Sequence, residues 1–444
     1  MKVRWGMESS SDRTPRPPTD PIRRSEDRYR PRVVDTELQT AIRLSPAASL
    51  FGPRGCGKTT TALQHARSSV LFDADPQPRE IAKVDPASLL HSDPPTLLDE
   101  WRLAPEIFGA MRHECDRRGE AGQFILAGSA EPSADPARHA GEGRVLPVRM
   151  RTMSLFESGD SDGSVSLRGL LDGDEPRHHG HDDVGLDDLV ALVCRGGWPQ
   201  YCELDADDAQ TVMRGYVEQL VSAGLPQDAE GRFSADITRA MLRSLARNES
   251  TAASLRTLAR DAGSNGHPLD VRTAARYLGG LSQLHLVEPL PAWAGSLRSP
   301  SPMRQSPKRY MCDPALAVAA LGGAPALLMD NIGYLGQALE SLALRDLRVY
   351  AQAAGATLGY FRDRHGHEVD VIVTDRRSGR WAAVEIKLGG AEAVAQAAGS
   401  LCRLRDRVDI ERAGQPAALV VLVGRGRAFR DGDVAVVPLT TLGP

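Results

Sequence analysis

The sequence predicts an α/β protein of several domains, and three observations lead to this fold class. Its 444 residues exceed the roughly 250–300 residues beyond which a chain usually divides into domains. Short apolar runs alternate with helical stretches over residues 36–155, and the same alternation returns after residue 332. This alternation is typical of a sheet covered by helices. The residues between the two parts read mainly as amphipathic helices.

The first part begins with a polar segment. Residues 1–32 consist mostly of Arg, Pro, Ser and Asp, and such a composition buries too little apolar surface to offset the entropy of ordering. We therefore predict a disordered tail over 1–32. Residues 33–156 then predict a parallel sheet wrapped by helices.

A glycine-rich loop lies inside this first domain. Residues 52–59 read Gly-Pro-Arg-Gly-Cys-Gly-Lys-Thr, after an apolar strand and before a helix. This pattern cradles phosphates with backbone N–H groups, while the lysine reaches the β and γ oxygens and the threonine hydroxyl binds Mg²⁺. A chance glycine turn is the alternative, which the correct flanks disfavour. The predicted nucleotide-binding residues are Gly52, Gly55, Gly57, Lys58, Thr59 and Thr60.

Four further residues complete the predicted ATP and Mg²⁺ site. Asp99 ends the apolar run 96–98 and is expected to hold the metal shell, and Glu100 to polarise the attacking water. Ser129 follows the next strand and either senses the γ-phosphate or caps a helix. Arg144 would stabilise transition-state charge from its own subunit or a neighbouring copy, unless it is a surface residue. A charged strand end is the alternative for Asp99 and Glu100.

These motifs, with residues 149–157 and the Gly-Gly-Trp-Pro of 196–199, resemble a family. The sequence is similar over about 35–440 to bacterial AAA-type ATP-binding proteins that end in domain of unknown function 4143. The resemblance implies a P-loop NTPase fold of the AAA+ or signalling-ATPase kind with a nucleotide-driven helical lid. The family usually has Gln two residues after its Asp-Glu pair, whereas Arg102 stands here.

The middle of the chain predicts four segments. Residues 157–188 hold ten acidic and two basic residues, so we interpret 157–187 as a solvated acidic insertion, followed by the helical lid over 188–232. Residues 233–312 predict a winged helix-turn-helix with a basic wing, and 313–329 a linker. The predicted phosphate contacts for DNA are Arg276, Arg298, Arg304 and Lys308. A winged helix that serves only as a protein spacer is the alternative.

The last domain, 330–444, carries the pattern D…E-x-K. Asp370 lies within a predicted strand, and Glu385 and Lys387 point to one face of the next. Two carboxylates can hold a divalent cation, and the lysine can orient or deprotonate a water that attacks a phosphodiester. This resembles the restriction-endonuclease-like PD-(D/E)xK nucleases, which implies further site residues at Glu340, on the preceding helix, and Gln396. A degenerate nuclease fold kept for structure or binding is the alternative.

Composition limits the remaining possibilities. A net charge of -4 means that any nucleic-acid contact needs a local basic patch. The chain holds 49 arginines and five lysines, so Lys58 and Lys387 stand out as positions that need an ammonium. The six cysteines form no CxxC pair and predict reduced thiols. Neither a membrane span nor a signal peptide is indicated, and we expect a cytoplasmic protein.

Together these features predict a DNA-associated, nucleotide-switched ATPase with a metal-dependent nuclease-like C-terminal domain and a possible homo-oligomeric state. ATP and Mg²⁺ are the expected cofactors, with a second divalent cation held by Asp370, Glu385 and Glu340. The alternative is an ATP-dependent signalling or interaction switch whose C-terminal domain binds a partner without catalysis.

Overall fold

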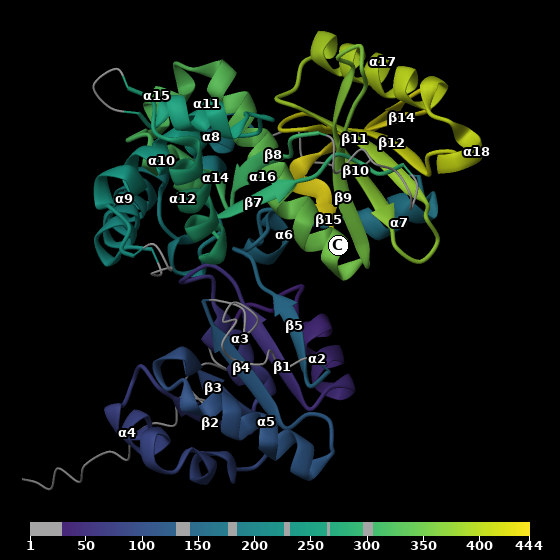
Figure 1. Ribbon diagram of the computed structural model, residues 1–444. Helices are drawn as coiled ribbons and strands as arrows, with labels where there is room; N and C mark the ends of the chain where they lie inside the picture. Colours follow the sequence, from purple (N-terminus) through teal and green to yellow (C-terminus); the bar gives the residue numbers. More distant parts are fainter. Residues whose placement is uncertain (1–28, 130–142, 176–183, 226–230, 264–266, 296–304) are drawn as a thin grey trace, which may run out of the picture.

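The computed structural model describes residues 29–129, 143–175, 184–225, 231–263, 267–295 and 305–444. Three domains follow one another (Figure 1): an N-terminal α/β domain below, a mainly helical middle domain at the upper left and a C-terminal α/β domain at the upper right. Among the described residues, no helix is long and apolar enough to cross a membrane.

The N-terminal domain is built on a five-stranded parallel sheet in the order β2-β3-β4-β1-β5. Its strands are β1 (Ala47–Phe51), β2 (Ser68–Leu71), β3 (Thr96–Asp99), β4 (Phe124–Gly128) and β5 (Val145–Arg149). Its helices are α2 (Asp35–Leu44), α3 (Lys58–His65), α4 (Pro76–Val84) and α5 (Glu106–Arg118), with the short turns η1 (Pro86–Leu90) and η2 (Trp101–Leu103).

Both faces of the five-stranded sheet are covered by helices. Every residue of β1 is buried, as expected for a central strand between two layers of helices. Leu38 of α2 and Ala62 of α3 pack on one face, and Ile107 of α5 on the other. The carboxyl ends of β1, β3 and β4 meet at one edge of the sheet, where ligands bind in folds of this type.

The described part of the middle domain consists of seven α-helices and a two-stranded ladder. Its helices are α8 (Leu186–Arg195), α9 (Ala206–Ala223), α10 (Ala235–Arg247), α11 (Leu255–Asp261), α12 (Val271–Gln283), α14 (Pro314–Ala320) and α15 (Pro325–Met329). The turn η4 (Pro199–Tyr201) lies between α8 and α9. Strands β7 (Val287–Leu290) and β8 (Lys308–Met311) pair antiparallel after the three helices α10 to α12.

The predicted linker 313–329 is instead a structural element. All seven residues of α14 are buried, and α14 packs against α8, α9, α10 and α16. Its Pro-Ala-Leu-Ala-Val-Ala-Ala sequence has no polar face, which is characteristic of a helix surrounded by protein.

The C-terminal domain is a mixed six-stranded sheet in the order β13-β14-β12-β11-β10-β9. Its strands are β9 (Ala356–Arg362), β10 (Glu368–Asp375), β11 (Trp381–Lys387), β12 (Ala418–Val423), β13 (Phe429–Asp431) and β14 (Val434–Pro438). Helix α16 (Ile332–Ala353) packs on one face and α17 (Ala391–Arg407) on the other, with α18 (Ile410–Ala413) and η5 (Leu439–Thr441) in the connections. Strands β9 to β11 are antiparallel, and β12 is parallel to β11.

The predicted acidic insertion also belongs to a core. Helix α6 (Leu155–Ser158), strand β6 (Val165–Ser166) and helix α7 (Leu167–Asp172) form the first part of that segment. Strand β6 pairs with β15 (Leu442–Gly443) at the end of the chain, and Leu167, Leu170 and Leu171 lie in the same cluster as α16. Asp172, Asp174 and Glu175, which follow these leucines, are exposed, so the average composition of the segment hides its apolar side. Residues 176–183 lie outside the described residues.

Candidate active site

The glycine-rich loop has the geometry that its glycines require. A Cβ on Gly52 would lie 2.0 Å from the carbonyl oxygen of Met150, so no other residue fits there. Gly55 and Gly57 have φ values of 79° and 103°, a left-handed conformation that side chains disfavour. Helix α3 begins directly after this turn at Lys58, and its first N–H groups face the loop, as in helix termini that bind anions.

Lys58, Thr59 and Asp99 lie together at the carboxyl edge of the sheet. The buried Lys58 donates from Nζ to the carbonyl oxygens of Gly52 and Pro53 at 3.1 and 2.9 Å. Thr59 donates from Oγ1 to Asp99 at 3.0 Å. Burial raises the pKa of Asp99 to about 6 because a buried carboxylate loses hydration. A hydroxyl and a carboxylate in contact are suitable ligands for Mg²⁺ beside a phosphate.

Glu100, Ser129 and Thr60 surround this centre. Glu100 follows Asp99 with a left-handed φ of 48°, and its backbone N–H donates to Ala127 at 2.9 Å. Ser129 follows β4 and lines a cavity of about 400 Å³ with Arg54 and Gly55. Thr60 lines a second cavity of about 710 Å³ on the other side of the loop. The volume of the second cavity is in the range of small-molecule sites.

Arg144 lies far from the residues that surround the phosphate-binding loop. It directly precedes β5, and its carbonyl accepts a hydrogen bond from Ala47, the first residue of β1. Its guanidinium pairs with Asp116 at 2.6 Å. Because the loop follows the last residue of β1, Arg144 lies at the opposite end of the sheet and cannot reach phosphates bound to its own subunit.

The segment after α8 covers the loop. Trp198 donates its indole N–H to the carbonyl oxygen of Arg54 at 3.0 Å, and its ring lies 3.2 Å from where a Cβ on Gly55 would be. Gln200 lines both cavities, and the ring of Tyr216 of α9 lies 5.5 Å from that of Trp198 at a tilted angle. The middle domain therefore supplies one wall of the nucleotide site.

Residues assigned by sequence to a disordered tail also contribute to the site. Arg32 is 6 % exposed and donates to the Cys56 carbonyl of the loop at 2.9 Å. Its Nε pairs with Glu157 at 3.0 Å. Tyr29 hydrogen-bonds Asp35 at 2.7 Å and lines the larger cavity. An isolated arginine in a polar segment gave no signal, because its partner Glu157 lies 125 positions away.

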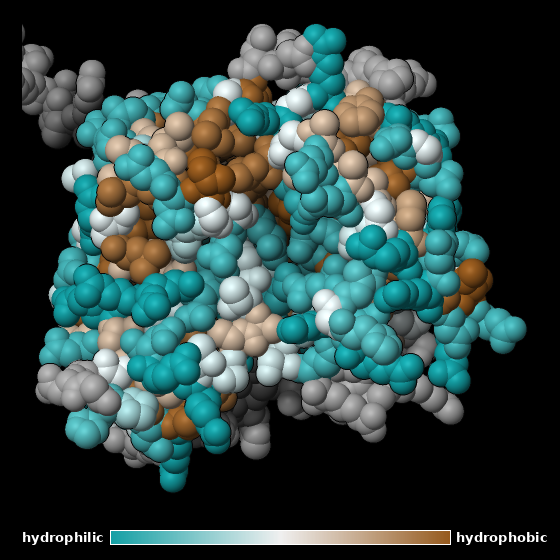
Figure 2. Space-filling view, turned by 90° about the horizontal axis from the view of Figure 1, so that it is seen from above, coloured by the Kyte–Doolittle hydropathy of each residue, from teal (hydrophilic) through white to brown (hydrophobic). Residues whose placement is uncertain are grey.

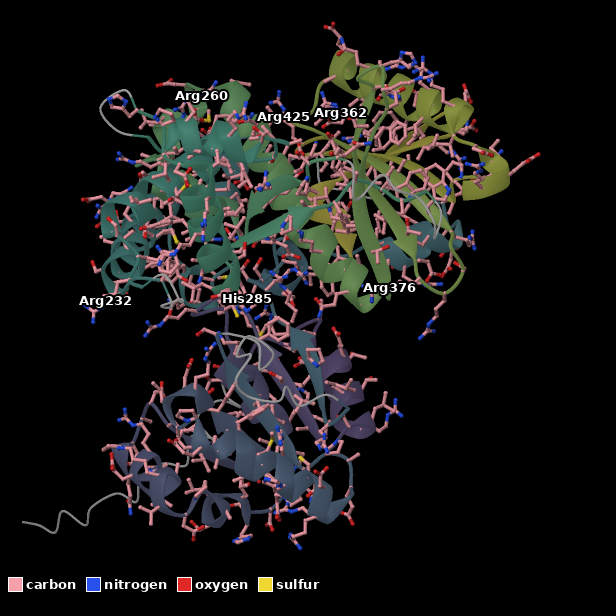
Figure 3. All side chains as sticks on the ribbon, in the orientation of Figure 1. Arg232, Arg260, His285, Arg362, Arg376 and Arg425 are labelled. Atoms are coloured by element: carbon pink, nitrogen blue, oxygen red, sulfur yellow. The ribbon has the colours of Figure 1, made fainter. Side chains whose placement is uncertain are left out.

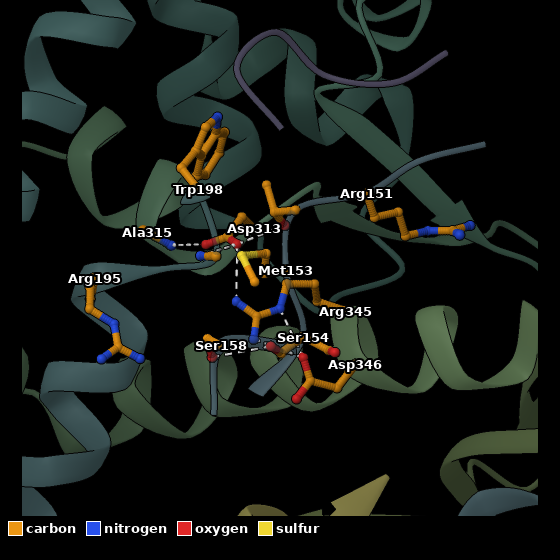
Figure 4. Close-up of polar contacts among 12 residues, drawn as sticks. Arg151, Met153, Ser154, Ser158, Arg195, Trp198, Asp313, Ala315, Arg345 and Asp346 are labelled. Carbon is orange, nitrogen blue, oxygen red and sulfur yellow. Dashed lines mark hydrogen bonds and ion pairs between the residues drawn. The ribbon is translucent and has the colours of Figure 1, made fainter. Parts of the chain in front are cut away.

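A buried network joins the segment over the loop to helix α16 (Figure 4). Asp313 accepts from the Gly197 N–H at 2.9 Å and from the Thr152 hydroxyl at 2.9 Å. Arg345 of α16 donates to Asp313 at 3.1 Å and to its neighbour Asp346 at 2.7 Å. Both side chains of the Arg345–Asp313 pair are at most 2 % exposed, so Asp313 without Arg345 would be a buried uncompensated charge.

A second junction joins all three domains around Glu288 of β7. Arg149 and Arg151, at the end of β5, pair with Glu288 at 3.2 and 2.7 Å. Arg348 of α16 lies 3.6 Å from the same carboxylate. Burial disfavours the charged form of Glu288, but the three arginines outweigh burial and lower its pKa. His285 lies at the same boundary (Figure 3), 5.1 Å from the ring of Phe51.

The C-terminal residues Asp370, Glu385 and Lys387 do come together. Lys387 Nζ lies 2.7 Å from Glu385 and 3.5 Å from Asp370, and Asp370 also accepts from the Ile386 N–H at 2.9 Å. Burial, followed by the charge of Asp370, raises the pKa of Glu385 to about 7. Gln396 does not contribute: it is exposed and hydrogen-bonds Glu392.

The ammonium of Lys308 lies among the carboxylates that the sequence predicted to hold a second divalent cation. Its ammonium is 3.1 Å from Glu340, 2.6 Å from Glu368 and 3.7 Å from Asp370. The predicted DNA contact by Lys308 is therefore wrong, because the side chain is 4 % exposed and faces the C-terminal domain. We name Glu340, Glu368, Asp370 and Glu385 the acidic cluster.

The acidic cluster as arranged does not fit a divalent cation. Three of its carboxylates already surround an ammonium, and across the described residues no group of three or more His, Cys, Asp or Glu is positioned to hold a metal ion. A metal at this place would need oxygen ligands at about 2.0–2.6 Å, and the same oxygens contact Lys308. The second-cation prediction is thus not supported by the observed geometry.

Three protein families match parts of the chain. Residues 45–158 match the AAA domain family, residues 186–326 match a domain of unknown function, DUF8612, and residues 335–442 match domain of unknown function DUF4143. A search of curated proteins found no match.

Solved structures that resemble the chain share little sequence with it. A Walker-type ATPase of Pyrococcus abyssi is 12 % identical with a TM-score of 0.42, over 65 % of this chain and 94 % of that one. A replication initiator DnaA bound to AMPPCP and single-stranded DNA is 15 % identical with a TM-score of 0.26, over 56 % and 86 %. Cdc6p from Pyrobaculum aerophilum is 16 % identical with a TM-score of 0.20, over 73 % and 97 %.

The matched AAA domain contains the glycine-rich loop, Lys58, Thr59 and Asp99. The chain is therefore an ATPase whose residues 45–158 match the AAA domain, which confirms that part of the sequence prediction. Residues 335–442 confirm the expected 4143 domain.

Proposed function

We propose that the chain is a nucleotide-switched, DNA-associated ATPase in which ATP binding changes the position of the middle and C-terminal domains. The observation that carries this proposal is the continuous contact from the phosphate loop to α16. Trp198 bonds the loop, and the adjacent Gly197 bonds Asp313, which bonds Arg345. A change in the conformation of the loop therefore acts on α16, and this helix extends to the acidic cluster.

In the hydrolysis reaction, each residue would have a distinct task. The Lys58 ammonium would exchange the carbonyls of Gly52 and Pro53 for phosphate oxygens, and Thr59 and Asp99 would hold Mg²⁺, which would neutralise phosphate charge. Glu100 orients and deprotonates the attacking water, and Ser129 contacts the γ-phosphate. Arg144 could act only on nucleotide that is bound to a second copy of the chain.

The switch follows from the lid contacts. The Trp198 indole accepts no hydrogen bond and donates only one, so its single N–H reports the position of the Arg54 carbonyl. Phosphates that draw the loop N–H groups inward would move that carbonyl and alter the contact. Because Gly197 has no space for a side chain next to Met153, the segment moves as a unit with its neighbours.

DNA association is supported by arginines on the middle domain. The predicted winged helix is supported by the order of three helices followed by the ladder of β7 and β8. On α10 and α11, the arginines at 243, 247 and 256 are exposed and, within the structure's described ranges, lack an ion pair, as phosphate contacts require. Arg276 is less available because it lies 4.2 Å over the Phe233 ring. Arg298 and Arg304 lie outside the described residues.

The C-terminal domain is proposed to have the nuclease-like fold. The order α16, β9, β10, β11, α17, β12 surrounds a sheet whose central strands carry Asp370, Glu385 and Lys387. A metal-dependent nuclease would use this centre. The ammonium of Lys308 against three carboxylates favours the second candidate function for this domain, a module that binds a partner without cleaving DNA.

The test is nucleotide-dependent DNA binding by the full chain. We expect the affinity for a labelled DNA duplex to differ at least tenfold between the complexes with a non-hydrolysable ATP analogue and with ADP. Fluorescence anisotropy measures this affinity. Lys58→Ala should remove the difference. The double change Arg243→Ala with Arg247→Ala should weaken binding in both states and lower the salt slope by about 2. Arg117→Ala, which removes an exposed, ion-paired arginine of α5, is the matched control.

Two results would reject parts of the proposal. DNA affinity that is equal in both nucleotide states would reject the switch but not the DNA association. Absence of DNA binding at low salt, with ATP hydrolysis intact, would favour a signalling switch. Divalent-metal-dependent cleavage of linear or branched DNA by the wild type, lost in Lys387→Ala, would establish the nuclease instead of the binding module.

A further inference from the structure

Lys308 extends from the middle domain into the acidic cluster of the C-terminal domain. It is the first residue of β8, and two positions later on the same face of the strand Tyr310 donates its hydroxyl to Glu340 at 2.6 Å. Glu340 is thus contacted by two side chains from one strand. These contacts connect residues 30 and 32 positions apart in the sequence.

The position of Lys308 is fixed by the sheet as well as by charge. Leu290 of β7 pairs with Lys308 in the antiparallel ladder. The chain after β7 continues along the edge strand β9, where the backbone N–H of Trp293 donates to the carbonyl oxygen of Tyr360 at 2.7 Å. Lys308 Nζ also lies 5.9 Å from the centre of the Tyr360 ring, a favourable position for a cation. A lysine held in this way is part of the folded core of both domains.

Two ammonium groups and one guanidinium offset most of the negative charge of the acidic cluster. The four carboxylates of the acidic cluster face two ammonium groups, Lys308 on the buried side and Lys387, 31 % exposed, on the open side. Arg362 lies 3.8 Å from Glu368 at the surface. Seen from above, the molecule is hollowed between the middle and C-terminal domains (Figure 2), with hydrophobic residues on part of the rim.

Lysine and a divalent cation would compete for the same oxygens. A hard cation needs several carboxylate oxygens at once, and Lys308 contacts one from each of Glu340, Glu368 and Asp370. Expelling a buried ammonium into water would leave at least two carboxylates facing each other in a region of low dielectric. The ammonium therefore has the advantage while β8 stays in place.

We propose that Lys308 is the resident cation of the acidic cluster and that the C-terminal domain, as assembled with the middle domain, binds no divalent cation there. The inference concerns the C-terminal domain of the proposed function, but it depends on neither ATP nor DNA. It gives this centre the role of an ionic joint between two domains. The short supply of lysine in the chain is consistent with a position that needs a compact ammonium, since a planar guanidinium could not approach three carboxylates in the same way.

The test is Mn²⁺ binding to the full chain without nucleotide. Binding is monitored through the electron paramagnetic resonance signal of free Mn²⁺. Every protein carries Asp99→Asn, which silences the ATP site. The parent should bind no Mn²⁺ at the acidic cluster. Lys308→Met should gain one site at least tenfold tighter than any in the parent, and adding Asp370→Asn should remove it. Lys83→Met, which changes a lysine that is 59 % exposed, should gain none.

Two results would overturn the proposal. One is a Mn²⁺ site in the parent that Asp370→Asn abolishes. The other is a folded Lys308→Met protein, shown by circular dichroism, that binds no Mn²⁺. If the methionine variant does not fold, Lys308→Gln replaces it in the same Mn²⁺ test. The glutamine amide can still donate a hydrogen bond to one carboxylate, but it carries no charge. Loss of nucleotide-dependent DNA binding in the wild type would leave this result unaffected, so the two proposals fail separately.

Discussion

The indole N–H of Trp198 lies 3.0 Å from the carbonyl oxygen of Arg54, although 144 positions separate the two residues in the sequence. Arg54 belongs to the phosphate loop, and Trp198 to the connection between α8 and η4. Because the next residue toward the N-terminus, Gly197, is bonded to Asp313 at 2.9 Å, this contact relates the nucleotide site to the packing of the other two domains.

ATP binding should change the fluorescence of Trp198. We expect an intrinsic emission change on addition of ATP that falls by at least half in Trp198→Phe, because the ring contacts the loop and its N–H bonds it. Trp381→Phe is the control, since Trp381 is 1 % exposed and packs on Trp293 in the C-terminal domain. An undiminished change in Trp198→Phe would show that the lid does not sense the loop.

Lys58 and Glu100 should have separable roles in hydrolysis. Lys58→Ala removes the charge that contacts phosphates, so nucleotide binding itself should be lost. Glu100→Gln should retain ATP binding while kcat falls by about 10²–10⁴, the usual contribution of a general base. Isothermal titration with ATP and a phosphate-release assay distinguish the two, with Lys83→Ala as the matched lysine control. Normal kcat in Glu100→Gln would assign the water-activating role elsewhere.

Removal of Asp313 should destabilise the whole protein. Asp313→Ala deprives Arg345 of one partner and leaves the Gly197 N–H and the Thr152 hydroxyl without their acceptor. Breaking a buried pair in this way costs about 3–5 kcal/mol of unfolding free energy, measurable by urea denaturation. Asp406→Ala, at an ion pair whose carboxylate is 66 % exposed, should change stability by less than about 1 kcal/mol. Equal effects of the two substitutions would contradict the network.

Stability should depend on pH through Glu249. Burial raises the pKa of this carboxyl to about 8, while the unfolded chain titrates near the ordinary value of about 4.3. Between these values the unfolded state loses its proton first, so the folded state loses about 1.4 kcal/mol of stability for each pH unit of rise. This contribution is complete below about pH 4 and gone above about pH 8.

Glu249→Gln removes that titration and tests it. The variant should gain stability over the wild type as the pH rises from 5 to 8, with no further gain above pH 8. Thermal unfolding monitored by circular dichroism at successive pH values measures the gain. Glu411→Gln, at an exposed position, should show no such trend. A constant difference across the range would mean that Glu249 ionises in the folded state near its ordinary pKa.

Local sequence determined the nucleotide loop and the strand that precedes it. Residues 52–59 are consecutive, and their backbone path depends on which of them are glycine, so the position of Lys58 and Thr59 follows from the sequence. The carboxylate at the end of β3 was predictable for a similar reason, because parallel strands that begin at one edge end at the other. The pairing of Glu385 and Lys387 depended on the alternation of side chains along one strand.

The tertiary structure alone decided which distant charges meet. Lys308 was interpreted as a DNA contact because its neighbours in the sequence are basic, whereas its partners Glu340, Glu368 and Asp370 come from α16 and β10. Arg32 in the predicted tail and α14 in the predicted linker were missed for the same reason. Composition averages over neighbours along the chain, but burial and ion pairing depend on neighbours in space, which the packing of the three domains supplies.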